Sequence, residues 1–197
     1  MRVITLIILL AVGTGARPSD SFPTWRGWEL KILSDSCRLS TSVESVVRQD
    51  SVWKGFLSGT PYEAAAIWIY AQTEVATGRY AEPRIGPARA LVHIFSNVEL
   101  DQNEMVELVD LGGVSSFGEE RLHRGKLQMF QFSGEETELI IEQLESSEPV
   151  ELVFYLSSGK RVATSIGPYI NVRFHVWRRA LEACIETNLT LTTNRLY

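Results

Sequence analysis

The segment 133–166, SGEETELIIEQLESSEPVELVFYLSSGKRVATSI, decides the fold that we predict for this chain. It opens with a capping box, in which the hydroxyl of Ser133 and the carboxylate of Glu136 each accept a hydrogen bond from the other residue's backbone N–H. Apolar side chains then recur on one face. Pro149 ends the pattern, because the residue before a proline avoids the helical conformation. We therefore expect a helix over 134–147.

A β-hairpin and a second helix follow in the predicted order. Residues 150–156 and 160–166 flank the turn Ser157-Ser158-Gly159, an arrangement typical of a hairpin. Beyond Gly167 and Pro168, apolar residues recur at the spacing of one helix face; they are Ile170, Phe174, Trp177, Leu181 and Cys184. This predicts a helix over about 169–185, with the polar residues 187–197 as a frayed tail or a last strand.

Short alternating or β-branched runs fill the chain before this segment. They predict strands over 25–33, 37–47, 52–57, 64–71, 90–95 and 122–132. Residues 76–88 hold two glycines and two prolines and predict a loop. Strands followed by late helices are typical of an α+β fold. We predict a single α+β domain over 25–197, built on a mostly antiparallel β-sheet or a partly closed barrel with the two late helices.

The first sixteen residues have the layout of a secretory signal. Met1 and Arg2 precede a short apolar run, and small residues at 13–16 supply a cleavage site after Ala16. The run is too short to span a bilayer, which takes about 20 apolar residues, and no second run approaches that length. We expect a signal peptide over 1–16, a flexible leader over 17–24, and a periplasmic or secreted mature chain without a transmembrane span. The 15 arginines against 4 lysines indicate a bacterial source.

Two cysteines, Cys37 and Cys184, stand near opposite ends of the mature chain. An even number of cysteines in an exported protein favours a disulfide, because the compartments outside the cytoplasm are oxidising. Redox or metal-binding pairs usually need close spacing such as C-x-x-C. Cys184 also falls on the apolar face of the predicted helix. We therefore expect a structural disulfide between the two.

Charge is distributed unevenly along this chain of net charge −5. An acidic protein is a poor candidate for binding nucleic acid. Residues 17–96 carry nine basic and eight acidic side chains, whereas 97–197 carry nine and sixteen. The predicted helix after Ser133 is rich in glutamate, which favours either solubility or a surface that docks a basic partner. Glu138, Glu142 and Glu145 are the candidate docking residues on that helix.

Tryptophan offers a second candidate surface. Trp25 and Trp53 stand at the ends of predicted elements among polar neighbours. Exposed tryptophans are typical of binding hot spots, although partial burial at a sheet edge is the more common reason for such positions. Trp25 and Trp53 are therefore included among the candidate partner-binding residues.

Known catalytic and metal-binding motifs are missing from the sequence. There is no G-x-S-x-G, phosphate-binding loop, dinucleotide fingerprint or H-E-x-x-H. We expect His93, His123 and His175 to be structural histidines with satisfied hydrogen bonds. Asp101 and Asn103 begin like a calcium loop, but the later ligand positions are apolar. We predict no catalytic residue, no metal and no cofactor, and we discount the glycosylation pattern Asn188-Leu189-Thr190.

The two ends of the mature chain carry a family resemblance. Trp28 and the string Cys37-Arg38-Leu39-Ser40 near the start, with Phe174 and the string 179–184 (RALEAC) on the closing helix, resemble the N-terminal domain of the flagellar motor protein family MotY. The resemblance implies a periplasmic module that attaches to the flagellar basal body by protein contacts, without catalysis. The family's OmpA-like peptidoglycan-binding domain has no counterpart in these residues, so the resemblance extends to docking and not to wall anchoring.

These observations favour an exported, periplasmic, non-enzymatic module of the cell envelope that binds another envelope protein, with a flagellar-motor association implied by the resemblance. One alternative is a cell-wall hydrolase with an unrecognised site, built on a carboxylate pair or on His123. Another is a periplasmic inhibitor or immunity protein with a protruding loop at 76–88 or 112–120. The identity of the partner and the oligomeric state stay open.

Overall fold

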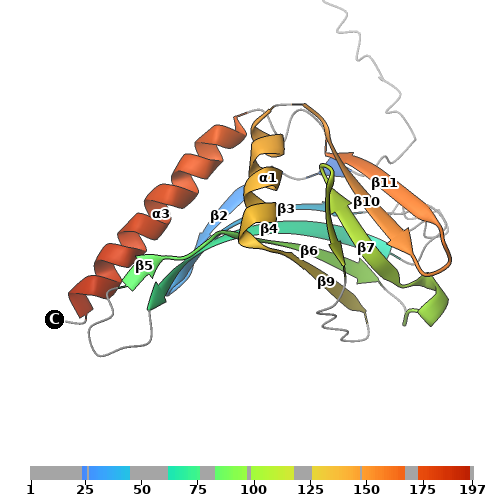
Figure 1. Ribbon diagram of the computed structural model, residues 1–197, viewed down its shortest axis with the longest axis horizontal. Helices are drawn as coiled ribbons and strands as arrows, with labels where there is room; N and C mark the ends of the chain where they lie inside the picture. The colour runs from blue at the N-terminus through green and yellow to red at the C-terminus, as the bar shows by residue number, and fades with distance from the viewer. Residues whose placement is uncertain are drawn as a thin grey trace, which may run out of the picture.

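The computed structural model describes residues 24–25, 27–44, 62–75, 83–96, 99–117, 126–146, 148–166 and 173–195. They form two antiparallel β-sheets and two α-helices, which confirms the predicted α+β class (Figure 1). Within the described strands the sheets stay separate and do not close into a barrel. The predicted signal peptide, Trp53 and His123 lie outside the described residues.

The larger sheet has the strand order β1-β3-β4-β6-β9, with β2 also paired to β3 and β5 also paired to β4. Its strands are β1 (Thr24–Trp25), β2 (Glu29–Ile32), β3 (Ser36–Glu44), β4 (Tyr62–Val75), β5 (Pro83–Ile85), β6 (Arg89–Ser96) and β9 (Leu127–Phe132). β4 is the central strand, and it buries Ala65, Ile67, Ile69 and Ala71 on one face. The strand β5 corrects the loop predicted for 76–88: Pro83, Arg84 and Ile85 pair with the end of β4.

The smaller sheet has the order β11-β10-β7-β8. It follows the short 3-10 helix η1 (Gln102–Glu104) and consists of β7 (Val106–Leu111), β8 (Val114–Phe117), β10 (Val150–Leu156) and β11 (Arg161–Ile166). The predicted hairpin of 150–166 is confirmed as β10 and β11. Gly112 and Gly113 connect β7 to β8 with positive φ angles of 65° and 85°, which suit glycine because it has no Cβ.

Helix α1 (Gly134–Glu145) begins at the predicted capping box. The backbone N–H of Glu136 donates to the Ser133 hydroxyl at 3.3 Å, and the N–H of Ser133 donates to the Glu136 carboxylate at 2.5 Å. Ile140, Ile141 and Leu144 point from α1 into the core. The sequence pattern therefore predicted this helix, its cap and its buried face.

Helix α3 (Phe174–Arg195) is longer than predicted. Residues 187–195 continue the helix, so the frayed tail or last strand expected there is wrong. Asn188 explains the extension: its side chain is buried, and its Nδ2 donates to the carbonyl oxygens of Leu33 and Ser36 at 3.3 Å each. These bonds attach the start of the C-terminal half of α3 to the turn between β2 and β3.

The core lies on one side of the larger sheet. Figure 1 shows α1, α3 and the smaller sheet on the convex side of the arched strands. The buried cluster there joins side chains of β3, β4, β6 and β9 to those of α1, α3, β7 and β10. Cys37 of β3 and Cys184 of α3 form the predicted disulfide, with their Cα atoms 6.2 Å apart. This bond ties the beginning of the larger sheet to the closing helix.

The opposite, concave side of the larger sheet carries no described helix or strand (Figure 1). Side chains alternate along a strand, so residues between the core positions point to this side. We call it the open face and define it by Lys31, Arg38, Trp68, Tyr70, Arg89, Leu91, His93, Phe95 and Met129. Neither described helix is long and apolar enough to cross a membrane.

Candidate functional site

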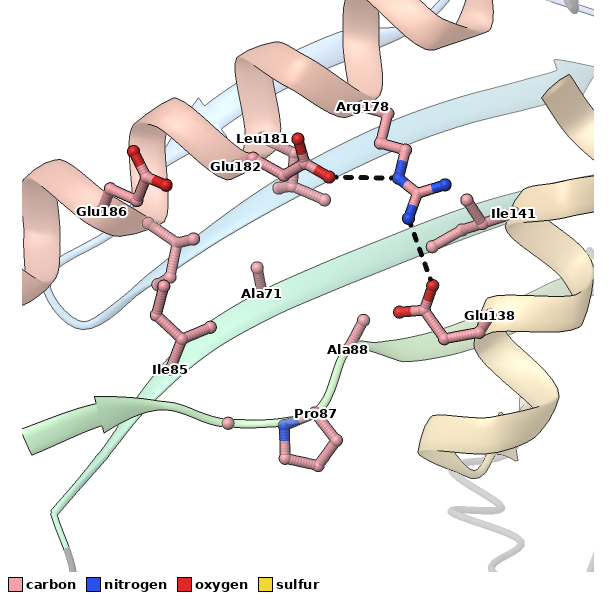
Figure 2. Close-up of a pocket in the computed structure, with 12 residues that line it drawn as sticks. Ala71, Ile85, Pro87, Ala88, Glu138, Ile141, Arg178, Leu181, Glu182 and Glu186 are labelled. Atoms are coloured by element: carbon pink, nitrogen blue, oxygen red, sulfur yellow. Dashed lines mark hydrogen bonds and ion pairs between the residues drawn. The ribbon is translucent and has the colours of Figure 1, made fainter.

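A groove lies on the convex side of the molecule, between α1, α3 and the link from β5 to β6 (Figure 2). Its volume is about 260 Å³. It is lined by Ala71, Ile85, Gly86, Pro87, Ala88, Glu138, Ile141, Arg178, Leu181, Glu182, Ile185 and Glu186. Residues far apart in the sequence therefore meet here, and we call this feature the α1–α3 groove.

The floor of the groove is apolar. Ile141 comes from the buried face of α1, and Leu181 and Ile185 come from successive turns of α3. Ala71 and Ala88 lie between the two helices, and their small side chains leave space that larger residues would fill. The two helices thus form the walls, and Ala71 of β4 and Ala88 of the β5–β6 link leave the space between them open.

The rim is charged and centred on Arg178. Its Nη1 lies 2.9 Å from Glu145, its Nε lies 3.1 Å from Glu182, and its Nη2 lies 3.5 Å from Glu138. Partial burial disfavours the charged guanidinium, but the hydrogen bonds and charges of the neighbouring glutamates outweigh this effect and raise the pKa of Arg178. Figure 2 shows Arg178 between Glu182 and Glu138, above the apolar floor.

The groove is acidic overall. Its lining contains three carboxylates, Glu138, Glu182 and Glu186, against the single guanidinium of Arg178. A neighbouring hollow shares Glu138 and the Pro87–Ala88 link and adds Glu135. Carboxylates therefore border the apolar floor from both helices, Glu135 and Glu138 from α1 and Glu182 and Glu186 from α3.

The structure places two of the predicted docking glutamates at this groove. Glu138 lines it and Glu145 holds Arg178 from the far side, whereas Glu142 is exposed on α1 outside the lining. The backbone of Trp25 pairs with β3, and nothing described bears on its side chain; Trp53 lies outside the described residues. Sequence reasoning missed Arg178 and Glu182, although their i,i+4 spacing is the usual signal of a helical ion pair.

The carboxylates of the groove are exposed. A catalytic general acid is usually buried in apolar surroundings. The side chains of Glu138 and Glu182 are 51% and 55% exposed, and each also pairs with Arg178. This rim suits electrostatic recognition better than proton transfer. Within the described ranges, no cluster of three His, Cys, Asp or Glu side chains could hold a metal ion.

The histidines differ from one another in burial. His175 is exposed on α3. His93 is buried on the open face, and neither ring nitrogen has a hydrogen-bond partner. Burial, together with the charge of Arg38, lowers the pKa of His93 to about 4. The expectation of satisfied histidines is therefore wrong for His93, which packs 3.8 Å from Trp68 between ring centres instead of forming hydrogen bonds.

Two other sequence candidates are placed by the structure. The Asn188 side chain is buried and bonded to the β2–β3 turn, so in the folded protein it is not presented for glycosylation. The segment 112–117 forms the β7–β8 turn and β8, ending at Phe117 with an exposed side chain. The rest of the loops predicted for an inhibitor, 76–82 and 118–120, lie outside the described residues.

Comparisons of this chain with protein-family models, curated proteins and solved structures find no match. The resemblance of the sequence to MotY therefore stays a prediction.

Proposed function

We propose that this protein is an exported, non-enzymatic binding module of the cell envelope, and that the α1–α3 groove receives a basic segment of its protein partner. One observation carries the proposal: the groove has an apolar floor, and the carboxylates of its lining outnumber its single cation. A lysine or arginine side chain matches both properties, because it has an aliphatic stem and a cationic end.

The two parts of the groove have different roles in this proposal. Burying the stem against Ile141 and Leu181 contributes about 0.8 kcal/mol for each CH₂ group. An exposed ion pair with Glu138 or Glu182 contributes roughly 0.2–1 kcal/mol. The floor therefore supplies most of the affinity, while the carboxylates select a basic partner and speed its association.

The envelope location rests on different observations. The first sixteen residues have the layout of a secretory signal, and the Cys37–Cys184 disulfide is compatible with an oxidising compartment. If the sequence resemblance to MotY reflects ancestry, the partner belongs to the flagellar basal body. This further assignment depends on the few residues that carry the resemblance.

Peptide binding tests the groove directly. The probe is a synthetic peptide that alternates lysine and leucine, titrated against residues 17–197 by fluorescence anisotropy, with a glutamate–leucine peptide as the charge-reversed comparison. We expect the double variant Glu138→Gln/Glu182→Gln to weaken lysine-peptide binding by roughly fivefold at low salt, in line with two exposed ion pairs. Glu142→Gln, on the same helix outside the groove, is the matched control.

Equal binding of the lysine peptide by the double variant and the parent protein would reject the groove as its site. The location is tested separately, by fusing residues 1–16 to a reporter enzyme that is active only after export. An inactive fusion would reject the envelope assignment while leaving the groove intact.

A further inference from the structure

A row of cations crosses the open face of the larger sheet. In the strand register, Lys31 of β2 lies opposite Arg38 of β3, Arg38 lies opposite Tyr70 of β4, and Tyr70 lies opposite Arg89 of β6. Directly opposed residues of antiparallel strands project to the same side of the sheet. Cys37 and Leu39, which flank Arg38, are fully buried in the core, so the row lies on the other side.

These cations lack counter-ions within the described part of the chain. Among the described residues, no carboxylate lies within the 4.0 Å ion-pair distance of Lys31, Arg38 or Arg89. Like charges directly opposite each other destabilise a sheet, and Lys31 and Arg38 are such a pair. Among the described residues, the three cations of this row therefore have no acidic partner, although the chain has an excess of carboxylates.

Arg38 is held in a defined position. Its guanidinium carbon lies 4.2 Å from the centre of the Trp68 ring, and its Nη1 donates to the Tyr70 hydroxyl at 3.5 Å. Its Nε is buried without a hydrogen-bond partner. A guanidinium has five N–H donors, and the only described partner of the two Nη groups of Arg38 is the Tyr70 hydroxyl.

An apolar band borders the cationic row. The next rows of the register place Trp68 opposite Leu91 and, one step further, His93 opposite Met129. Trp68, Leu91 and Met129 are half-buried, so they present apolar surface on the concave side. Charged and apolar surfaces therefore run side by side across the strands.

We propose that the open face binds an acidic segment of a protein partner, with aspartate or glutamate side chains on Arg38 and Arg89 and apolar side chains on Trp68, Leu91 and Met129. The cations supply charge complementarity, and guanidinium groups pair well with carboxylates. The apolar residues beside them match the apolar side chains of a polypeptide.

Stacking ligands, such as sugars and nucleobases, and lipid surfaces fit this face less well. A sugar ring or nucleobase stacks on a free aromatic face, but Trp68 already contacts Arg38 at 4.2 Å and His93 at 3.8 Å. A lipid surface is broad and flat, whereas the open face is the concave side of the sheet (Figure 1). The geometry therefore favours a narrow polypeptide segment over either of them.

This site is independent of the α1–α3 groove. The groove is acidic and lies on the convex side with the helices, while the cationic row lies on the opposite side of the same sheet. Failure of one proposal therefore leaves the other standing, because each uses its own residues and a probe of opposite charge.

The test uses residues 17–197 and a peptide that alternates glutamate and leucine, with the lysine–leucine peptide as comparison. We expect the glutamate peptide to bind, to weaken toward about 0.5 M salt, and to lose roughly tenfold in affinity in Arg38→Gln/Arg89→Gln. Arg161→Gln, an exposed arginine of β11 that pairs with Glu151, is the matched control and leaves binding unchanged.

A second variant, Arg89→Glu, distinguishes a loss of binding from a loss of folding. Arg89 is exposed, and reversing its charge leaves the Arg38–Trp68 contact in place. We expect it to weaken binding with an unchanged thermal midpoint. Unchanged glutamate-peptide affinity in both variants would overturn the proposal. So would binding of polygalacturonate or of phosphatidylglycerol vesicles that equals or exceeds binding of the peptide.

Discussion

The side-chain amide of Gln128 in β9 pairs with the backbone of Val106 in β7. Its Oε1 accepts from the Val106 N–H at 3.1 Å, and its Nε2 donates to the Val106 carbonyl at 3.1 Å. The Tyr62 hydroxyl donates to Gln128 Oε1 in the same buried network. One amide side chain thus reproduces the two hydrogen bonds of a strand pair and joins the larger sheet to the smaller one.

Replacing Gln128 with leucine should destabilise the fold. The Val106 carbonyl would lose its bond to the amide, whereas the Tyr62 hydroxyl would keep its bond to the Glu104 carbonyl, and we expect a cost of about 1–3 kcal/mol for the buried hydrogen bonds that are lost. Urea unfolding measures the free energy difference. Gln131→Leu, at an exposed position of the same strand, should change stability by less than about 0.5 kcal/mol; equal effects would contradict the network.

Removing the disulfide should lower the free energy of unfolding by more than the Gln128 substitution does. Cys37 and Cys184 enclose a sequence separation of 147 residues. The chain-entropy model for such a loop gives roughly 5 kcal/mol, an upper bound that real bridges often miss. We expect Cys37→Ala/Cys184→Ala to unfold at much lower urea. Dithiothreitol should shift the unfolding midpoint of the parent protein toward that of the variant and leave the variant itself unchanged.

Asn188 should matter for folding and not for glycosylation. Asn188→Ala removes the hydrogen bonds to the carbonyls of Leu33 and Ser36 and should cost about 1–3 kcal/mol. Thr190→Ala destroys the same sequence pattern at an exposed position. Thermal unfolding of the two variants tests this, and we expect only Asn188→Ala to lower the unfolding temperature strongly. Equal decreases in the two variants would contradict a structural role for the Asn188 side chain.

Stability should depend on pH through His93. Burial and Arg38 lower its pKa from 6.5 to about 4, so between these values the unfolded chain binds a proton that the folded protein does not. The stabilisation is therefore complete above about pH 6.5 and is lost as the pH falls toward 4. The pKa difference corresponds to roughly 3 kcal/mol at most.

His93→Phe should flatten this part of the pH profile of unfolding. The exposed His175 provides the control: His175→Gln should show the same pH dependence of unfolding as the parent protein. An unchanged slope between pH 6.5 and 4 in His93→Phe would assign the pH dependence to other groups.

Arg178 should have opposite effects on stability and binding. Arg178→Gln removes the cation that holds Glu138, Glu145 and Glu182. We expect a loss of stability of about 1 kcal/mol, because these pairs are partly exposed. Binding of the lysine–leucine peptide should strengthen, because the groove becomes more negative. Weaker peptide binding with an intact fold would mean that Arg178 itself contributes to the contact.

Local patterns were sufficient for the helix α1, the β10–β11 hairpin and the disulfide. Each depends on residues close in sequence, or on the even cysteine count in a chain with a predicted export signal. The capping box at Ser133 and the apolar spacing of Ile140, Ile141 and Leu144 act within a few turns of one helix. These elements can be predicted from the sequence because the interactions that form them join residues close together in the chain.

The misjudged segments depend on distant partners. The last turns of α3 have little apolar pattern of their own, and Asn188 secures them by bonds to a turn about 150 residues earlier. The strand β5 is short and contains a proline, and it is defined by its pairing with the end of β4. His93 lies in a strand, as predicted, but its burial without a partner follows from the rings packed around it.

The amino-acid sequence by itself determined the α+β class, the capped helix, the hairpin and the two cysteines that pair. Tertiary structure alone decided where charge gathers: Glu138 meets Arg178 between two helices, and Lys31, Arg38 and Arg89 line up across three strands. The physical reason is that periodicity specifies which face of an element is buried, whereas the register between strands and the crossing of helices specify which exposed residues become neighbours.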